Sequence, residues 1–149
     1  MTCLDSVESL TSTVSRMKAN SASPTLDRAA RIEAFREGGG AGKPVHIQHT
    51  ISWADTQDEA MASALDQWAP VAIGGEINWD IRRPSDFDHL ARFVDEEHIG
   101  RSVRVSADPG LHRADLQAFA ELGVDTVFVH NVGRNQDAFI DMAARELVG

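Results

Sequence analysis

The sequence contains one cysteine, Cys3, in 149 residues. A lone cysteine cannot form a disulfide within the chain, so we expect a protein of the reducing cytoplasm rather than a disulfide-stabilised secreted domain. No apolar run approaches the ~20 residues of a membrane-spanning helix. The N-terminal stretch has acids at Asp5 and Glu8 and no continuous apolar segment of a signal peptide. We therefore predict neither a membrane partner nor export.

Basic residues are also scarce. The 14 lysines and arginines stand against 23 aspartates and glutamates, which gives a formal net charge of -9. A strongly acidic protein is repelled by phosphate backbones and by anionic lipids, so we expect no nucleic-acid partner and no binding to membrane surfaces. The hydrophobic content of 42% is enough for one domain with a real core.

Two apparent ligand motifs do not fit the sites that they resemble. His46 and His49 are three residues apart on a predicted strand, where their side chains point to opposite faces. With no HExxH motif and no cysteine pair, we predict no metal site. The run GGGAGKP differs from a phosphate-binding loop because Glu37 occupies the first glycine position and Pro44 replaces the serine or threonine. We interpret it as a connector from a helix to a strand.

Strand-like and helix-like segments alternate after Pro24. β-branched and alternating runs predict strands, and periods near 3.6 residues predict helices. Proline and glycine mark the ends of several helices, and the segment from Val71 to Arg83 has no clean period. We expect Asp55 to cap the second helix, Pro70 to end it and Asn135 to cap the last. The predicted strands are 45–52, 102–107 and 125–130, and the predicted helices are 25–37, 55–68, 84–94, 111–122 and 136–147.

This alternation predicts an α/β fold with parallel strands, either an open sheet or a closed barrel. In both architectures, ligands bind at the carboxyl ends of the strands. Each predicted strand ends in polar or aromatic residues, which we take as candidates for a substrate or cofactor pocket. They are His49, Thr50, Ser52 and Trp53 at the end of the first strand, Ser106 and Asp108 after the second, and His130 and Asn131 after the third.

Five separated blocks of the sequence match one known family in the right order. They are KPVHIQHTISWA from residue 43, QW at 67, INWDIRRPSDFD from 77, VRVSADPGLH from 103 and ELGVDTVFVHNVGRNQDAFID from 121. Between about Ile32 and Leu147 the chain resembles the C-terminal part of luciferase-like flavin oxidoreductases, in the branch related to F420-dependent glucose-6-phosphate dehydrogenase. This branch includes probable non-F420 flavin oxidoreductases.

The resemblance implies a partial (β/α)8 TIM barrel, namely its C-terminal half over residues 25–149, with helices outside the parallel strands. Residues 1–24 are unmatched, and we expect them to be irregular. The family uses F420 or FMN for hydride transfer or monooxygenation on small organic substrates. Its proton-handling groups come mainly from the earlier strands, so we name no catalytic residue. The pocket candidates are His49, Trp53, Trp79, Ser106, His130 and Asn131.

The resemblance also bears on the substrate. Sugar-phosphate dehydrogenases of this branch hold the phosphate with a lysine and an arginine. This sequence has Asn78 and Ser102 at the matching positions, although Arg101 and Arg104 flank the second one. A phosphosugar needs concentrated positive charge, so we expect a different substrate.

Each candidate also has a purely structural interpretation. His130 is equally well explained as a strand-end histidine bonded to backbone, and residues 131–136 as a turn and helix cap. Trp53 and Trp79 fit ordinary packing positions, and Asp108 before Pro109 is a common helix start. The chain itself could be a noncatalytic half-barrel that self-associates or pairs with a missing N-terminal half, because a partial barrel has open strand edges.

Overall fold

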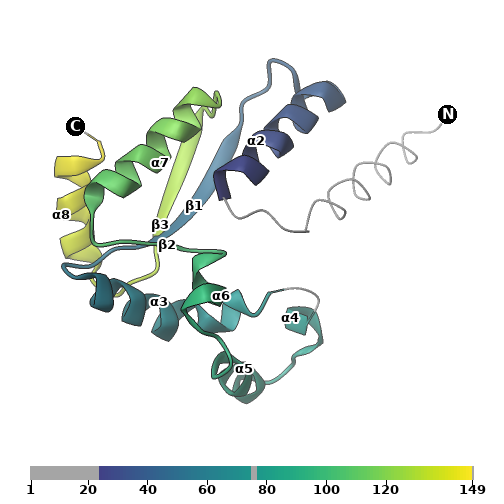
Figure 1. Cartoon of the computed structure of the whole chain (residues 1–149). Helices are drawn as coiled ribbons and strands as arrows, with labels where there is room; N and C mark the ends of the chain where they lie inside the picture. The colour runs from purple at the N-terminus through teal and green to yellow at the C-terminus, as the bar shows by residue number, and fades with distance from the viewer. Residues whose placement is uncertain (1–23, 75–76, 149) are drawn as a thin grey trace. The chain divides into compact units, whose positions relative to one another are not determined.

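The computed structural model describes residues 24–74 and 77–148 (Figure 1). The chain divides into two compact units, residues 1–41 and residues 42–149. Apart from Pro24, the predicted irregular N-terminal segment lies outside the described residues. No helix in the described ranges combines the length and the apolar character needed to cross a membrane.

The described part of the first unit is one helix with a glycine-rich end. Helix α2 spans Pro24–Phe35, and a single π-helical turn, η1, covers Arg36–Gly40. Gly39 has a φ of 101°, a conformation that favours glycine because it has no Cβ. The prediction that the glycine run ends this helix is confirmed.

The second unit is built on three parallel strands. They are β1 (His46–Ser52), β2 (Arg104–Val105) and β3 (Thr126–Asn131). Strand β1 lies in the middle and pairs with β3 from His46↔Thr126 to Ile51↔Asn131. The three predicted parallel strands are confirmed.

Strand β2 is shorter than predicted and pairs with β1 only at Ile51 and Ser52. The backbone N–H groups of Ser102 and Val103 both donate to the carbonyl of Ile99, so residues before Arg104 continue a helix end instead of the ladder. One further bond, from Ser106 N–H to the Ser52 carbonyl, extends the pairing beyond β2.

Helices cover both faces of this sheet. On one face, His49 contacts α7, and Ile51 and Val129 pack on α8. On the other, the Ser52 hydroxyl donates to the Ala60 carbonyl of α3 (Figure 1). The parallel α/β architecture is as predicted, and the three described strands lie in the order β2-β1-β3. The helices are α3 (Gln57–Ala72), α4 (Ile77–Asp80), α5 (Pro84–Ala91), α6 (Glu96–Gly100), α7 (Pro109–Glu121) and α8 (Gln136–Glu146).

Helix α3 differs from its prediction at both ends. Thr56, not Asp55, is the N-cap: its hydroxyl accepts the Glu59 N–H at 3.2 Å and donates to the Glu59 carboxylate at 2.9 Å. The Thr-x-x-Glu pattern is that of a capping box, but here the Glu59 carboxylate accepts the Thr56 hydroxyl. Pro70 does not end the helix, which continues to Ala72. A proline so near the end removes only one of the helix's hydrogen bonds.

The core consists of two clusters that lie on different faces of the sheet. The first joins Ile51 and Trp53 to α8 through Phe139 and Met142. Ile140 of the same helix lies outside this packed side and is exposed. The second cluster joins α3 and α6 to the strand ends and consists of Ala64, Ile99, Val103 and Val132.

Candidate functional site

The carboxyl ends of β1 and β3 are joined by one asparagine side chain. Asn131 is buried, and its Oδ1 accepts the backbone N–H of Trp53 at 3.1 Å. Its Nδ2 donates to Asn135 Oδ1 at 3.2 Å, and Asn135 Nδ2 donates to the Trp53 carbonyl at 3.0 Å. The two asparagines therefore satisfy both backbone groups of Trp53, as a further strand would.

The turn after β3 is shaped to allow this arrangement. A Cβ on Gly133 would overlap Asn135 Oδ1, so a larger residue would displace the Asn135 side chain. Gln136 Nε2 donates to the carbonyl of Asn131 at 3.2 Å and also to that of Gly133. Asn135 occupies the predicted N-cap position of α8, but its side chain makes no capping bond because it is bound to Trp53.

The end of β2 is tied to the same region. The indole N–H of Trp53 donates to the Ala107 carbonyl at 3.1 Å. Ser106 Oγ accepts the Asp108 N–H at 3.0 Å, and Asp108 caps α7 by accepting the Gly110 N–H at 2.8 Å. The structural interpretation of Asp108 as a helix start is therefore confirmed.

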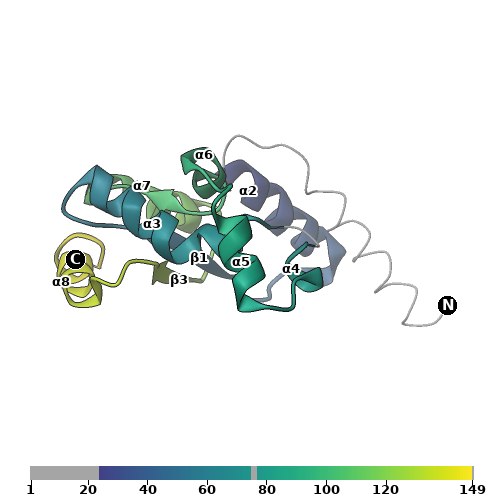
Figure 2. The same cartoon turned by 90° about the horizontal axis from the view of Figure 1, so that it is seen from below.

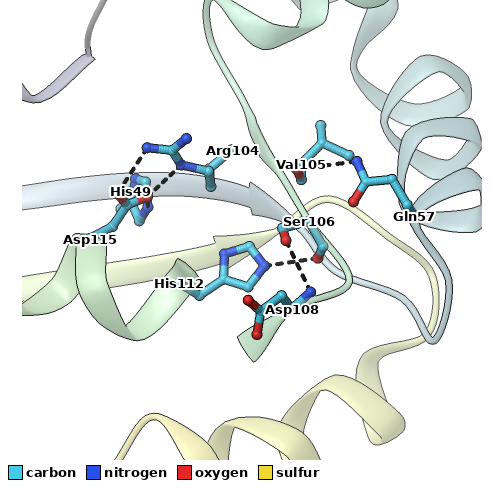
Figure 3. Close-up of polar contacts among 8 residues, drawn as sticks. All are labelled: His49, Gln57, Arg104, Val105, Ser106, Asp108, His112 and Asp115. Atoms are coloured by element: carbon cyan, nitrogen blue, oxygen red, sulfur yellow. Dashed lines mark hydrogen bonds and ion pairs between the residues drawn. The ribbon is translucent and has the colours of Figure 1, made fainter. Parts of the chain in front are cut away.

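Gln57, which the sequence did not single out, bridges α3 to the same segment. Its Oε1 accepts the Ala107 N–H at 3.2 Å, and its Nε2 lies 3.5 Å from the Val105 carbonyl (Figure 3). An amide side chain in a first helical turn carries no sequence signal for such a bridge.

His112 lies beneath this segment, in the first turn of α7 (Figure 3). Only 1% of the residue is exposed, and its Nε2 lies 3.0 Å from the Ser106 carbonyl. A carbonyl only accepts, so Nε2 carries the proton and Nδ1 is an acceptor without a hydrogen-bond partner among the described residues. Burial lowers the pKa of His112, and the Ser106 carbonyl and the Asp115 carboxylate oppose that shift. The imidazole is neutral at neutral pH.

A charge cluster lies further along the same face of the sheet. Arg104 of β2 binds Asp115 of α7 with two hydrogen bonds, Nε to Oδ2 at 2.6 Å and NH2 to Oδ1 at 2.9 Å. His49 of β1 places Nε2 3.3 Å from Asp115 Oδ2, and its ring packs edge-on against Phe119 at 5.1 Å. This cluster connects β1, β2 and α7.

The structure brings together only some of the six predicted pocket residues. Trp53, Ser106 and Asn131 meet at the strand ends, and all three are buried. His49 is also buried but lies within β1, against α7.

The other two lie elsewhere. His130 is exposed on the opposite face, where its ring lies 5.2 Å from that of Trp68. Trp79 is 88% exposed on α4. Helix α4 lies beyond the C-terminal end of α3, whereas the strand ends lie near the N-terminal end of α3 (Figures 1 and 2). The described residues contain no group of three or more His, Cys, Asp or Glu side chains that could hold a metal ion.

Known proteins resemble this chain over part of their length. No protein-family model matches it. The F420-dependent glucose-6-phosphate dehydrogenase of Kineococcus radiotolerans is 27% identical over 122 residues, which cover 78% of this chain and 36% of that protein. The enzyme of the same name from Intrasporangium calvum is 25% identical over 81 residues, 54% of this chain and 24% of that protein. Over these residues the chain is similar to F420-dependent glucose-6-phosphate dehydrogenases, consistent with a luciferase-like oxidoreductase.

A solved structure supports the fold. An F420-dependent secondary alcohol dehydrogenase in complex with an F420–acetone adduct superimposes with a TM-score of 0.61 at 17% identity. The match covers 76% of this chain and 35% of that one. The chain therefore shares the architecture of part of a luciferase-like TIM barrel. It spans between 24% and 36% of the length of the curated relatives described above.

Proposed function

We propose that this chain forms part of an F420-dependent oxidoreductase that transfers hydride between the cofactor and a small organic substrate. The observation that supports this most directly is the similarity, over 78% of the chain, to an F420-dependent dehydrogenase. F420 is favoured over FMN because the relatives and the structural neighbour described above are all named for F420. The lone Cys3 supports a cytoplasmic location.

The exposed groups near the end of β3 are the best fit for the cofactor. His130 is exposed and packs on Trp68, which offers aromatic surface to a flat ring. Arg134 is also exposed; it lies 3.6 Å from Asp66 and offers a cation to an anionic tail. The cofactor would supply the hydride chemistry, and these residues would bind and orient it. Trp53, Ser106 and Asn131 would support that surface from beneath.

The charges argue against a sugar phosphate as the substrate. Two arginines lie near the start of β2. Arg104 is held by two hydrogen bonds to Asp115, whereas Arg101 forms an exposed pair with Glu97 at 2.7 Å. A single exposed arginine supplies less positive charge than a phosphosugar needs. We therefore propose an uncharged organic substrate, such as an alcohol or a carbonyl compound.

A second candidate is a noncatalytic half-barrel that self-associates. The observation in its favour is that the polar side chains at the strand ends bind one another: Asn131 and Asn135 hold Trp53, and Ser106 holds Asp108. Groups engaged in this way stabilise the fold and leave fewer donors for a ligand.

Titration of the purified chain with F420 and, separately, with FMN tests the proposal, with light scattering to measure the mass. We expect F420 binding that is saturable but weak, because losing half of a site's contacts removes ~4 kcal/mol of binding free energy, about a thousandfold in affinity. We expect FMN to bind more weakly than F420. Arg134→Ala should weaken F420 binding several-fold, and the matched control Arg101→Ala should not. Absence of F420 binding together with a stable oligomer would support the half-barrel instead.

A further inference from the structure

Four titratable side chains from three elements lie close together between α7 and the sheet. His49 comes from β1, Arg104 from β2, and His112 and Asp115 from α7 (Figure 3). The side chains of His49 and Asp115 are only 6% and 12% exposed. Such a group is sensitive to pH because a change in charge cannot be screened by water.

His112 connects this interior to the strand ends. Its Nε2–H donates to the carbonyl of Ser106, and the next carbonyl, of Ala107, accepts the indole N–H of Trp53. The position of the segment from Ser106 to Asp108 therefore depends on the first turn of α7. A movement of His112 would break its bond to the Ser106 carbonyl, which is one of the bonds that hold this segment in place beside β1.

The charges around His112 show what a proton on it would do. At neutral pH the Arg104 cation and the Asp115 anion offset each other. A proton on His112 adds a positive charge in a buried position. Burial disfavours this protonation most strongly, and the nearby Arg104 cation also disfavours it. The Asp115 and Asp108 carboxylates favour protonation, but less strongly than burial disfavours it. His49 differs, since a proton on it would lie directly beside the Asp115 carboxylate.

We propose that His112 is an acid-sensitive latch, which releases the first turn of α7 and the Ser106–Asp108 segment from the sheet when the medium becomes mildly acidic. The latch rests on the burial of His112, on its bond to Ser106 and on the charges around it, and needs no bound cofactor. Its consequence, loss of the surface near the strand ends where a cofactor would bind, rests on the proposed function.

The direction and the size of the effect follow from proton linkage. In the open form His112 is in water and has the ordinary pKa of about 6.5. In the closed form its pKa is lowered, so between the two values the open form binds more protons. Lowering the pH from about 7.5 to about 5.5 therefore shifts the opening equilibrium by up to about tenfold for one such histidine.

Hydrogen exchange on the full chain tests the latch without any ligand, so its outcome is independent of the proposed function. Labelling times are adjusted for the intrinsic pH dependence of exchange. Peptides from residues 106–116 should exchange up to about tenfold faster at the lower pH. Peptides from α8, residues 136–146, should change little and serve as the internal control.

Two variants assign the effect to one side chain. His112→Gln keeps an N–H donor for the Ser106 carbonyl but cannot be protonated, so the acid response of residues 106–116 should disappear. His49→Gln, at the other buried imidazole, should leave that response in place. An unchanged response in His112→Gln overturns the proposal. If His112→Gln does not fold, NMR titration of the unmodified chain decides the matter, because a His112 pKa at or above the ordinary value contradicts the latch.

Discussion

The strand ends and the segment from Ile77 to Val94 contain similar residue types in opposite environments. At the strand ends, Trp53 and Asn131 are buried and hydrogen-bonded to each other. In the other segment Trp79 and Phe93 are 88% and 79% exposed, and α5 contains no buried residue. An aromatic side chain therefore helps to hold the backbone together in one region, whereas two aromatic side chains face the solvent in the other. The first region should be sensitive to substitution, and the second should tolerate it.

The largest expected difference in the free energy of unfolding is between substitutions of two phenylalanines. Phe119→Ala removes a ring that is 1% exposed and packs against His49, so it should destabilise the chain by about 3–5 kcal/mol. Phe93→Ala should change the free energy of unfolding by less than about 0.5 kcal/mol. Urea denaturation followed by circular dichroism measures both values. Equal small losses would show that α7 does not pack on the sheet.

A smaller loss is expected at Asn131. Asn131→Ala leaves the buried N–H of Trp53 without its acceptor and should destabilise the chain by about 2 kcal/mol. Asp88→Ala, at an exposed position of α5, is the control and should have almost no effect. The same denaturation experiment measures both. A decrease in stability below about 0.5 kcal/mol for Asn131→Ala would mean that water replaces the acceptor of the Trp53 N–H, so the strand ends are open to solvent.

The smallest expected difference is between two arginines. Arg104→Lys loses one of the two parallel hydrogen bonds to Asp115. Because Arg104 is 39% exposed, the free energy of unfolding should fall by only about 1 kcal/mol. Arg101→Lys, whose bond to Glu97 joins two exposed side chains, should lie within about 0.3 kcal/mol of the parent. Thermal unfolding at low and high salt separates them. Equal effects would show that the buried cluster contributes no more than a surface pair.

The strands and most helices were predictable because their signals are local. The β-branched runs of β1 and β3 predict strands, and Asp108–Pro109 predicts the start of α7. The length of β2 was not predictable, since it depends on the backbone bonds that Ile99 accepts.

The site was less predictable because its contacts are distant in sequence. The bond between Trp53 and Asn131 joins residues 78 positions apart, and no local pattern indicates it. His112 was missed although a signal existed: His112, Asp115 and Phe119 are spaced i, i+3, i+7 on the predicted helix. That spacing indicates one buried face with two ionisable groups.

The central position of β1 has a consequence for the order in which the chain folds. Its main partner, β3, begins 80 residues later, as the register of His46 with Thr126 shows. During synthesis β1 therefore leaves the ribosome long before β3 exists, and its edge toward β3 stays unpaired until residue 131 has emerged. Pairing over such a separation is slow, and an unpaired strand is prone to aggregation in the meantime. Nascent chains that stall before β3 should therefore depend on chaperones more than the complete chain does.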